Sequence, residues 1–261
     1  MAFLPTTKEE MQEQGYEQVD FIYVLGDAYV DHPSFGCAII TRTLQAFGYS
    51  CAILAQPDWH KDEEFLQFGT PRLGFLVSAG NIDSMVNHYS VNKRRRDQDA
   101  YSDDGIMGKR PDRPTIVYTQ ILKRLFPDVP VLIGGIEASL RRLAHYDYWD
   151  DKVRRSILID SQADLLMFGM GENTIVEVAD ALNSGLAVQD ICYIRGTVWK
   201  SKTLDMIVDD YILLPSYKQV RTDKRAYAKS FMIQYENQDA INSKMLIEAY
   251  EGWYVICNQP P

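Results

Sequence analysis

The chain has 261 residues, of which 46% are hydrophobic and 24% are charged, and its formal net charge is −9. These values are ordinary for a folded, globular protein and exclude intrinsic disorder as the expected state. The acidic balance argues against broad binding to nucleic acid or to acidic membranes, because phosphate contacts require a basic surface.

The chain opens with a polar, acidic segment over residues 1–19, which we expect to be a lead-in to the fold. An unbroken apolar run follows at residues 21–25, and such a run is typical of a parallel strand covered by helices on both faces. The carboxyl ends of such strands border the ligand crevice of an open α/β sheet. We therefore expect a ligand to contact the polar residues that follow this strand, Asp27, Asp31 and His32.

Strand-length apolar runs and helix-period segments alternate through the next part of the chain. The runs predict further strands over residues 50–55, 73–77, 131–133 and 163–168. The helical pattern predicts helices over residues 35–47, with Ser34 as the N-cap, and over residues 62–68, 115–125 and 169–182. This alternation predicts a doubly wound, mostly parallel α/β sheet of about five strands over residues 20–190.

A long segment without regular pattern, residues 78–114, separates the third and fourth strands. A loop of this length in a compact domain is usually functional or partly disordered. It contains a basic cluster, Lys93, Arg94, Arg95 and Arg96. Two interpretations stay open, a solvated basic loop and a lid that binds an anion or docks a partner.

Two glycine pairs follow the fourth and fifth strands. Gly134 and Gly135, with Glu137, stand at the crevice end of the fourth strand, where glycine lets the backbone approach a ligand closely or turn sharply. Gly169 and Gly171 open the helix after the fifth strand, and free amides at a helix start attract anions. On its own, this second motif is weak evidence for a dinucleotide site.

The pattern becomes less regular in the rest of the chain. The aromatic and acidic run at residues 145–151 is expected to lead into a helix. Short strands are expected within residues 191–199 and at 253–257, and a polar helix within residues 216–240. We expect residues 191–261 to form an extension that leads toward a further domain.

Four cysteines lie far apart, and no CxxC or CxxxCxxC spacing joins them, so they predict no zinc or iron–sulfur site. They are Cys37, Cys51, Cys192 and Cys257. The sequence shows no signal peptide and no apolar run near the ~18 residues that a membrane span needs. We therefore expect a cytoplasmic chain with reduced thiols and no membrane partner.

No nucleophile elbow, P-loop or dinucleotide fingerprint is found, so the residues alone predict a small-molecule or partner-binding α/β domain without a defined reaction. The histidines and aspartates of the strand-end loops leave a metal-dependent hydrolase as a weaker alternative.

Five runs of this sequence, in this order, resemble the amino-terminal region of the YgiQ family of radical SAM proteins. They are GDAYVDHPSFG at 26–36, AQPDW at 55–59, NHYSVNKRRRDQDAYSDDG at 87–105, GGIEASLRR at 134–142 and GMGE at 169–172. The resemblance covers nearly the whole chain. It implies a Rossmann-like domain, similar to the cobalamin-binding domains of other radical SAM enzymes. In the family this domain precedes a barrel whose CxxxCxxC motif ligates a [4Fe–4S] cluster that binds and cleaves S-adenosylmethionine.

The sequence departs from the family pattern in two places. The cluster motif is absent, so the resemblance places the cluster and S-adenosylmethionine beyond Pro261, and we expect this chain alone to bind neither and to be inactive. The cobalamin-type DxHxxG loop is not matched, because Asp31 directly precedes His32, and cobalt ligation by His32 is therefore not supported.

The resemblance thus implies the amino-terminal domain of a radical SAM enzyme of undefined substrate. Its crevice would form part of the substrate or cofactor site, and its partner would be the following radical SAM domain. A non-catalytic module that binds an anion, a small molecule or a partner remains the alternative.

Overall fold

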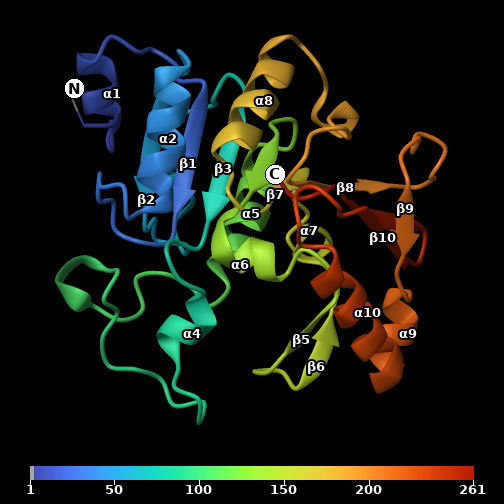
Figure 1. The fold of residues 1–261 in the computed structure, drawn as a ribbon. Coiled ribbons are helices and arrows are strands. Elements are labelled where there is room, and N and C mark those ends of the chain that lie inside the picture. Colours follow the sequence, from blue (N-terminus) through green and yellow to red (C-terminus); the bar gives the residue numbers. More distant parts are fainter. Residues whose placement is uncertain (1–2) are drawn as a thin grey trace.

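A nine-stranded sheet runs through the structure, a computed structural model that describes residues 3–261 (Figure 1). Its strand order is β2-β1-β3-β4-β7-β8-β11-β10-β9. The first five strands in this order are parallel, β8, β11 and β10 continue the sheet in antiparallel pairing, and β9 is parallel to β10. The strands are β1 (Phe21–Leu25), β2 (Cys51–Ala55), β3 (Gly74–Ser78), β4 (Val131–Ile133), β7 (Leu165–Met167), β8 (Thr197–Ser201), β9 (Tyr211–Leu213), β10 (Met245–Tyr250) and β11 (Trp253–Cys257).

The other elements are helices and one small hairpin. The hairpin pairs β5 (His145–Asp147) with β6 (Lys152–Arg154). The α-helices are α1 (Lys8–Glu13), α2 (Gly36–Ala46), α3 (Asp62–Leu66), α4 (Ser84–His88), α5 (Pro114–Leu125), α6 (Gly135–Leu140), α7 (Ile157–Asp160), α8 (Glu172–Asn183), α9 (Tyr217–Thr222) and α10 (Lys224–Glu236). Two 3₁₀ turns complete the list, η1 (Asp103–Gly105) and η2 (Val188–Asp190).

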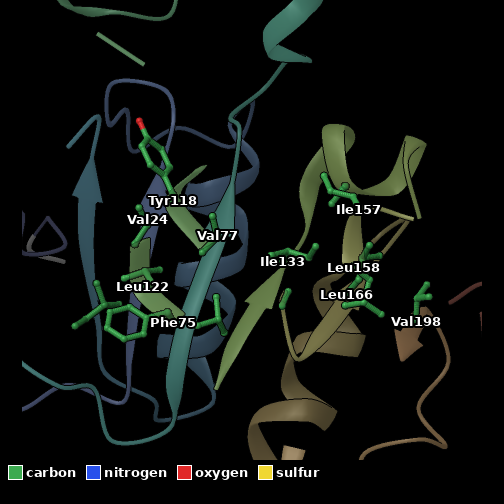
Figure 2. Packing of buried hydrophobic residues seen from close by; sticks show 14 of the residues in the cluster. Val24, Phe75, Val77, Tyr118, Leu122, Ile133, Ile157, Leu158, Leu166 and Val198 are labelled. Carbon is green, nitrogen blue, oxygen red and sulfur yellow. The ribbon is translucent and has the colours of Figure 1, made fainter. Parts of the chain in front are cut away.

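The predicted doubly wound, mostly parallel sheet is confirmed, because helices cover both of its faces. Successive residues of β1 point into two separate cores. Phe21 packs with Leu44 in the core beneath α2 and α8, whereas Val24 packs with Tyr118 and Leu122 of α5 on the opposite face (Figure 2). Burial on both faces explains why this strand is an unbroken apolar run in the sequence.

The C-terminal part of the sheet exceeds the prediction. The two short strands expected near residues 191–199 and 253–257 correspond to β8 and β11. Between them in the chain, β9 and β10 were not predicted, and together these four strands extend the five parallel ones into a single sheet.

One local prediction is wrong. Ser34 does not cap α2, because the helix begins at Gly36 and its N-cap is Phe35; the Ser34 amide donates to Nδ1 of His32 at 3.1 Å within the preceding loop. The helix expected after residues 145–151 is α7, and the run itself forms the first strand and the turn of the β5–β6 hairpin, in which the Asp147 carboxylate accepts the Trp149 amide at 2.9 Å.

The polar helix expected within residues 216–240 is present as α10, and a second helix, α9, precedes it. The break falls at Asp223, whose carboxylate accepts a hydrogen bond from the Arg225 amide at 2.8 Å and caps α10. Asp223 therefore starts a new helix where the sequence pattern suggests continuation. Among the helices of residues 3–261, none is both long enough and apolar enough to cross a bilayer.

A buried carboxyl group lies in β10. Glu248 is fully buried, and its Oε2 accepts hydrogen bonds from the Ala144 amide at 2.9 Å and from the Tyr250 hydroxyl. Its Oε1 has no hydrogen-bond partner in the part of the chain that the structure describes. Burial raises the pKa of Glu248 from its ordinary value of 4.5 to about 7, against the opposing effect of the two hydrogen bonds. The ionised carboxylate therefore destabilises the fold.

The contribution of Glu248 to the free energy of unfolding should consequently fall as pH rises from 4.5 to about 7. The unfolded carboxyl group releases its proton near pH 4.5, whereas the folded one keeps it until about pH 7. Glu248→Gln should remove this contribution and make the variant more stable than the wild type at pH 7.5, by at most about 3 kcal/mol. Urea unfolding at several pH values between 4.5 and 7.5 measures the difference.

Glu251→Gln is the matched control, because Glu251 is an exposed carboxylate close to Glu248 in the same hairpin. This variant should keep the wild-type dependence of the free energy of unfolding on pH. The slope that remains in Glu248→Gln combines opposite contributions, because burial raises the pKa of Asp27 to about 6 and lowers the pKa of His145 to about 4. An unchanged slope in Glu248→Gln would contradict the assignment.

Candidate ligand-binding site

A cavity of about 230 Å³ opens where the parallel strands end, between α2 and α8. Its floor is formed by residues of four parallel strands, Tyr23, Leu76, Val77, Leu132 and Met167. Its walls come from α2, including Ile39 and Ile40, and from α8, including Ile175. The cavity thus occupies the crevice in which open α/β sheets bind ligands.

Four glycines predicted as site residues lie together in the lining of this cavity, Gly134, Gly135, Gly169 and Gly171. Gly135 has a φ of +78°, and a side chain there would approach Cβ of Ser78 at 3.2 Å, so this position requires glycine. Helix α8 begins beside the cavity, with Gly171 as an N-cap that offers no side-chain hydrogen bond. The first amides of α8 therefore remain available to a ligand.

The side chains of the cavity are mostly apolar. The Tyr23 hydroxyl donates a hydrogen bond to Oγ of Ser78 at 3.1 Å, and burial raises the Tyr23 pKa. Glu172, in the first turn of α8, contributes the carboxylate of the lining. The cavity therefore suits a flat or apolar group that is held mainly by close backbone contact.

Asp27 does not line this cavity, and other parts of the chain engage its carboxylate. Arg110 donates from Nη1 to Oδ1 of Asp27 at 2.6 Å, and the Asn81 amide donates to Oδ2 at 2.7 Å. The same guanidinium donates to the carbonyl of Ala79 at 2.9 Å and to both oxygens of Asp99 at 3.0 Å. Arg110 is among the largest fully buried side chains of residues 3–261.

The two carboxylates on Arg110 have different electrostatic environments. Burial raises the pKa of Asp27 to about 6, although the Asn81 amide and Arg110 oppose the shift. Burial acts in the same direction on Asp99, but the Tyr101 amide and Arg110 together hold the pKa of Asp99 below its ordinary value. Asp99 is therefore the firmly ionised partner of the buried guanidinium.

A second set of hydrogen bonds continues from this ion pair. His88 lies with Nε2 at 4.0 Å from Asp99, and its Nδ1 is 2.7 Å from Asp112. The Tyr89 hydroxyl donates to Asp112 at 2.6 Å. The segment 78–114, expected to lack regular structure, contains α4 and η1, and α4 lies at the lower left of Figure 1. The hydrogen bond from Arg110 to Asp27 ties this segment to the carboxyl end of β1.

The remaining acidic and histidine candidates lie outside the cavity lining. Asp31 accepts a hydrogen bond from Nε of Arg42 at 3.1 Å, and this partner holds the pKa of Asp31 below its ordinary value. His32 is exposed. Glu137 is buried and accepts from the Ser84 hydroxyl at 2.6 Å and from the Thr115 amide at 3.3 Å, so it joins α4 and α5 to the start of α6.

The basic cluster is exposed, and none of its members lines the glycine cavity; Arg96 lines a different groove. Sequence reasoning missed Asp99 and Arg110, the two residues that close the buried ion-pair network. Their signal in the sequence is weak, because both lie in a segment dense in charges.

The described residues do not fit an iron–sulfur cluster or another metal centre. Across residues 3–261, no group of three or more His, Cys, Asp or Glu side chains is placed to hold a metal ion. All four cysteines are free, and Cys37, Cys51 and Cys257 are buried.

The chain is similar to known proteins over the whole of its described length. The radical SAM N-terminal family matches residues 3–261. A UPF0313 protein of Clostridium perfringens is 54% identical over 258 residues, which cover 99% of this chain and 39% of that protein. A UPF0313 protein of Clostridium botulinum is 51% identical over 260 residues, which cover 100% of this chain and 40% of that protein. The chain thus spans about two fifths of the length of these relatives.

A solved structure of TsrM, a radical S-adenosylmethionine methyltransferase from Kitasatospora setae with tryptophan substrate and a SAM analog bound, is similar with a TM-score of 0.46 and 19% identity. The similarity covers 69% of this chain and 28% of that chain.

The buried ion pairs predict a large effect of removing Arg110. Arg110→Met should lower the free energy of unfolding by about 3–5 kcal/mol, because Asp27 and Asp99 would lose their buried countercharge. Urea denaturation at pH 7 measures this loss, and hydrogen exchange should locate the added opening in residues 78–114.

Arg124→Met is the control, because Arg124 forms an ion pair with Asp62 in which both side chains are about half exposed. It should cost less than about 1 kcal/mol. Equal losses in the two variants would show that the Arg110 network contributes little.

Proposed function

Because the chain belongs to the radical SAM N-terminal family, we propose that it is the amino-terminal domain of a radical SAM enzyme and that its glycine-lined cavity forms part of the substrate or cofactor site. The family assignment confirms the resemblance found in the sequence. The observation that carries the proposal is the location of the cavity, at the carboxyl edge of the parallel sheet in a chain whose family precedes a catalytic domain.

Three of the sequence runs that resemble the YgiQ family supply the glycines of this cavity. Gly36 comes from the first run, Gly134 and Gly135 come from GGIEASLRR, and Gly169 and Gly171 come from GMGE. The segments that identify the family therefore also line the cavity, which supports a role in the family's function.

Pro261 lies beside the lining of the cavity. Pro261 packs so closely against Gly169 and Gly196 that a side chain at either glycine would contact it at 3.1 Å. Gly169 lines the cavity, so in longer relatives the residues after this position would leave beside it. We accordingly propose three functional units, a lead-in over 1–19, the cavity-bearing domain over 20–190, and an extension over 191–261 that continues toward the radical SAM barrel.

In this arrangement the [4Fe–4S] cluster and S-adenosylmethionine belong to the following domain. The residues of this chain do not fit a cluster, so no step of that chemistry is assigned to them. Their role is to bind one face of a ligand through glycine backbone and apolar contacts, and to exclude water from it.

Iron and sulfide analysis tests the enzyme assignment. A longer relative, such as the UPF0313 protein of Clostridium perfringens, should contain about four iron and four sulfide per chain after anaerobic purification. The 261-residue chain should contain neither. Absence of iron and sulfide from the longer protein would contradict the enzyme assignment, and a stable cluster in the short chain would contradict the division of roles.

Filling the cavity tests its role in binding. Gly134 has extended backbone, and a Cβ there would lie 3.5 Å from the nearest atom, the Met167 carbonyl oxygen, so Gly134→Leu should fold and fill the cavity. A ligand found by titration with cobalamin and phosphate-bearing compounds should bind the variant at least about tenfold more weakly.

Ile136→Leu is the control, because Ile136 is exposed on the same helix and does not line the cavity. It should bind like the wild type. If Gly134→Leu binds every such ligand as tightly as the wild type, the cavity is not their site. Binding by the short chain, together with a longer relative that lacks iron, would favour the non-catalytic binding module.

A further inference from the structure

A second groove, of about 410 Å³, lies between the segment after α4 and the β5–β6 hairpin. Its lining includes four aromatic side chains, Tyr89, Tyr146, Tyr148 and Trp149. It also includes Arg96 of the basic cluster, and it shares no residue with the glycine-lined cavity. We call it the aromatic groove.

Direct contacts hold the two sides of the aromatic groove together. The rings of Tyr89 and Trp149 pack with their centroids 4.0 Å apart, and the Tyr148 hydroxyl donates to the Val91 carbonyl at 2.9 Å. Lys93 donates from Nζ to the Trp149 carbonyl at 2.8 Å and lies 5.0 Å from the centre of the Tyr148 ring. These contacts hold the two sides of the groove in a fixed arrangement, which lowers the entropic cost of binding.

The carboxylates of the groove are already engaged by the protein. Asp83 forms an ion pair with Arg141 and accepts the Met85 amide at 3.0 Å. Asp147 accepts from Nη2 of Arg113 at 2.8 Å and from the Trp149 amide at 2.9 Å. Neither carboxylate therefore presents an unpaired negative charge to the groove.

Arg96 has no such partner. Its side chain is exposed, and its guanidinium forms no ion pair or hydrogen bond with another of residues 3–261, whereas its backbone amide donates to the His88 carbonyl at 2.8 Å. The groove thus combines aromatic surface with one uncompensated guanidinium on a fixed backbone.

We propose that the aromatic groove binds a flat aromatic ring that carries an anionic group, with the ring on the aromatic side chains and the anion on Arg96. Aromatic side chains stack on planar ligands, and arginine binds phosphate and carboxylate groups in bidentate geometry. The volume matches sites for single small molecules. A nucleic acid strand fits less well, because Asp97, Asp150 and Asp151 interrupt the basic surface beside the groove.

Calorimetric titration of the 261-residue chain tests the proposal with four probes. AMP and indole-3-acetate carry both a flat ring and an anion, adenosine carries only the ring, and inorganic phosphate only the anion. At least one of the first two should bind about tenfold or more tightly than adenosine and phosphate. Comparison of AMP with indole-3-acetate distinguishes a phosphate from a carboxylate ligand.

Two arginine variants locate the anion. Arg96→Gln should weaken the binding of the tighter of AMP and indole-3-acetate by about tenfold, and should change the affinity for adenosine by no more than about twofold. Arg94→Gln removes the same charge from an exposed side chain that does not line the groove, and it should bind like the wild type. Trp149→Leu should weaken the binding of AMP, indole-3-acetate and adenosine alike.

Three results would overturn the proposal. One is the absence of binding by AMP and indole-3-acetate up to millimolar concentration. Another is equal weakening by Arg94→Gln and Arg96→Gln, which would indicate diffuse electrostatic attraction. The third is affinity that rises with the length of an oligonucleotide, which would indicate a nucleic acid surface. None of them depends on iron or on the glycine-lined cavity, so they leave the proposed function to its own test.

Discussion

The guanidinium of Arg110 is the interaction on which the functional edge of this protein depends. It is fully buried between Asp27, at the end of β1, and Asp99, in the long loop. Taking three charges out of water is costly, so the arrangement persists only because the geometry satisfies each of them. Glycine makes that geometry accessible, since a Cβ at Gly80 would lie 2.0 Å from the Asp27 carboxylate. The ion pairs thereby fix a long, polar segment against the sheet.

The structural role of a glycine is easier to predict from the sequence alone than the role of a carboxylate. A glycine reports a local backbone requirement, so Gly135 and Gly169 could be placed at the crevice from the sequence, and both line the cavity. A carboxylate indicates only that it needs hydrogen-bond or ion-pair partners, without saying which residues they are. The partner of Asp27 is 83 residues away in the chain, and sequence spacing cannot reveal it. Ligand contact by Asp27 or Glu137 stays a prediction, since protein groups engage both carboxylates in the structure.

The burial of each strand explains whether it could be predicted from the sequence. The five neighbouring parallel strands, β1, β2, β3, β4 and β7, are covered on both faces and are therefore apolar runs in the sequence. By contrast, β10 contains the buried Glu248, and β9 is a three-residue strand with exposed Tyr211 and Leu213. The β5–β6 hairpin depends on hydrogen bonds from backbone amides to the side chain of Asp147, which no hydrophobic period indicates.

The buried network also connects the two candidate sites physically. From β1 it proceeds through side chains in direct or near contact, in the order Asp27, Arg110, Asp99, His88, Asp112, Tyr89 and Trp149. Its first member follows the strand whose Tyr23 lines the glycine cavity, and its last two members line the aromatic groove. The network therefore supports the aromatic groove directly, through Tyr89 and Trp149, whereas a substitution at Gly134 or at Arg96 changes the lining of one site alone.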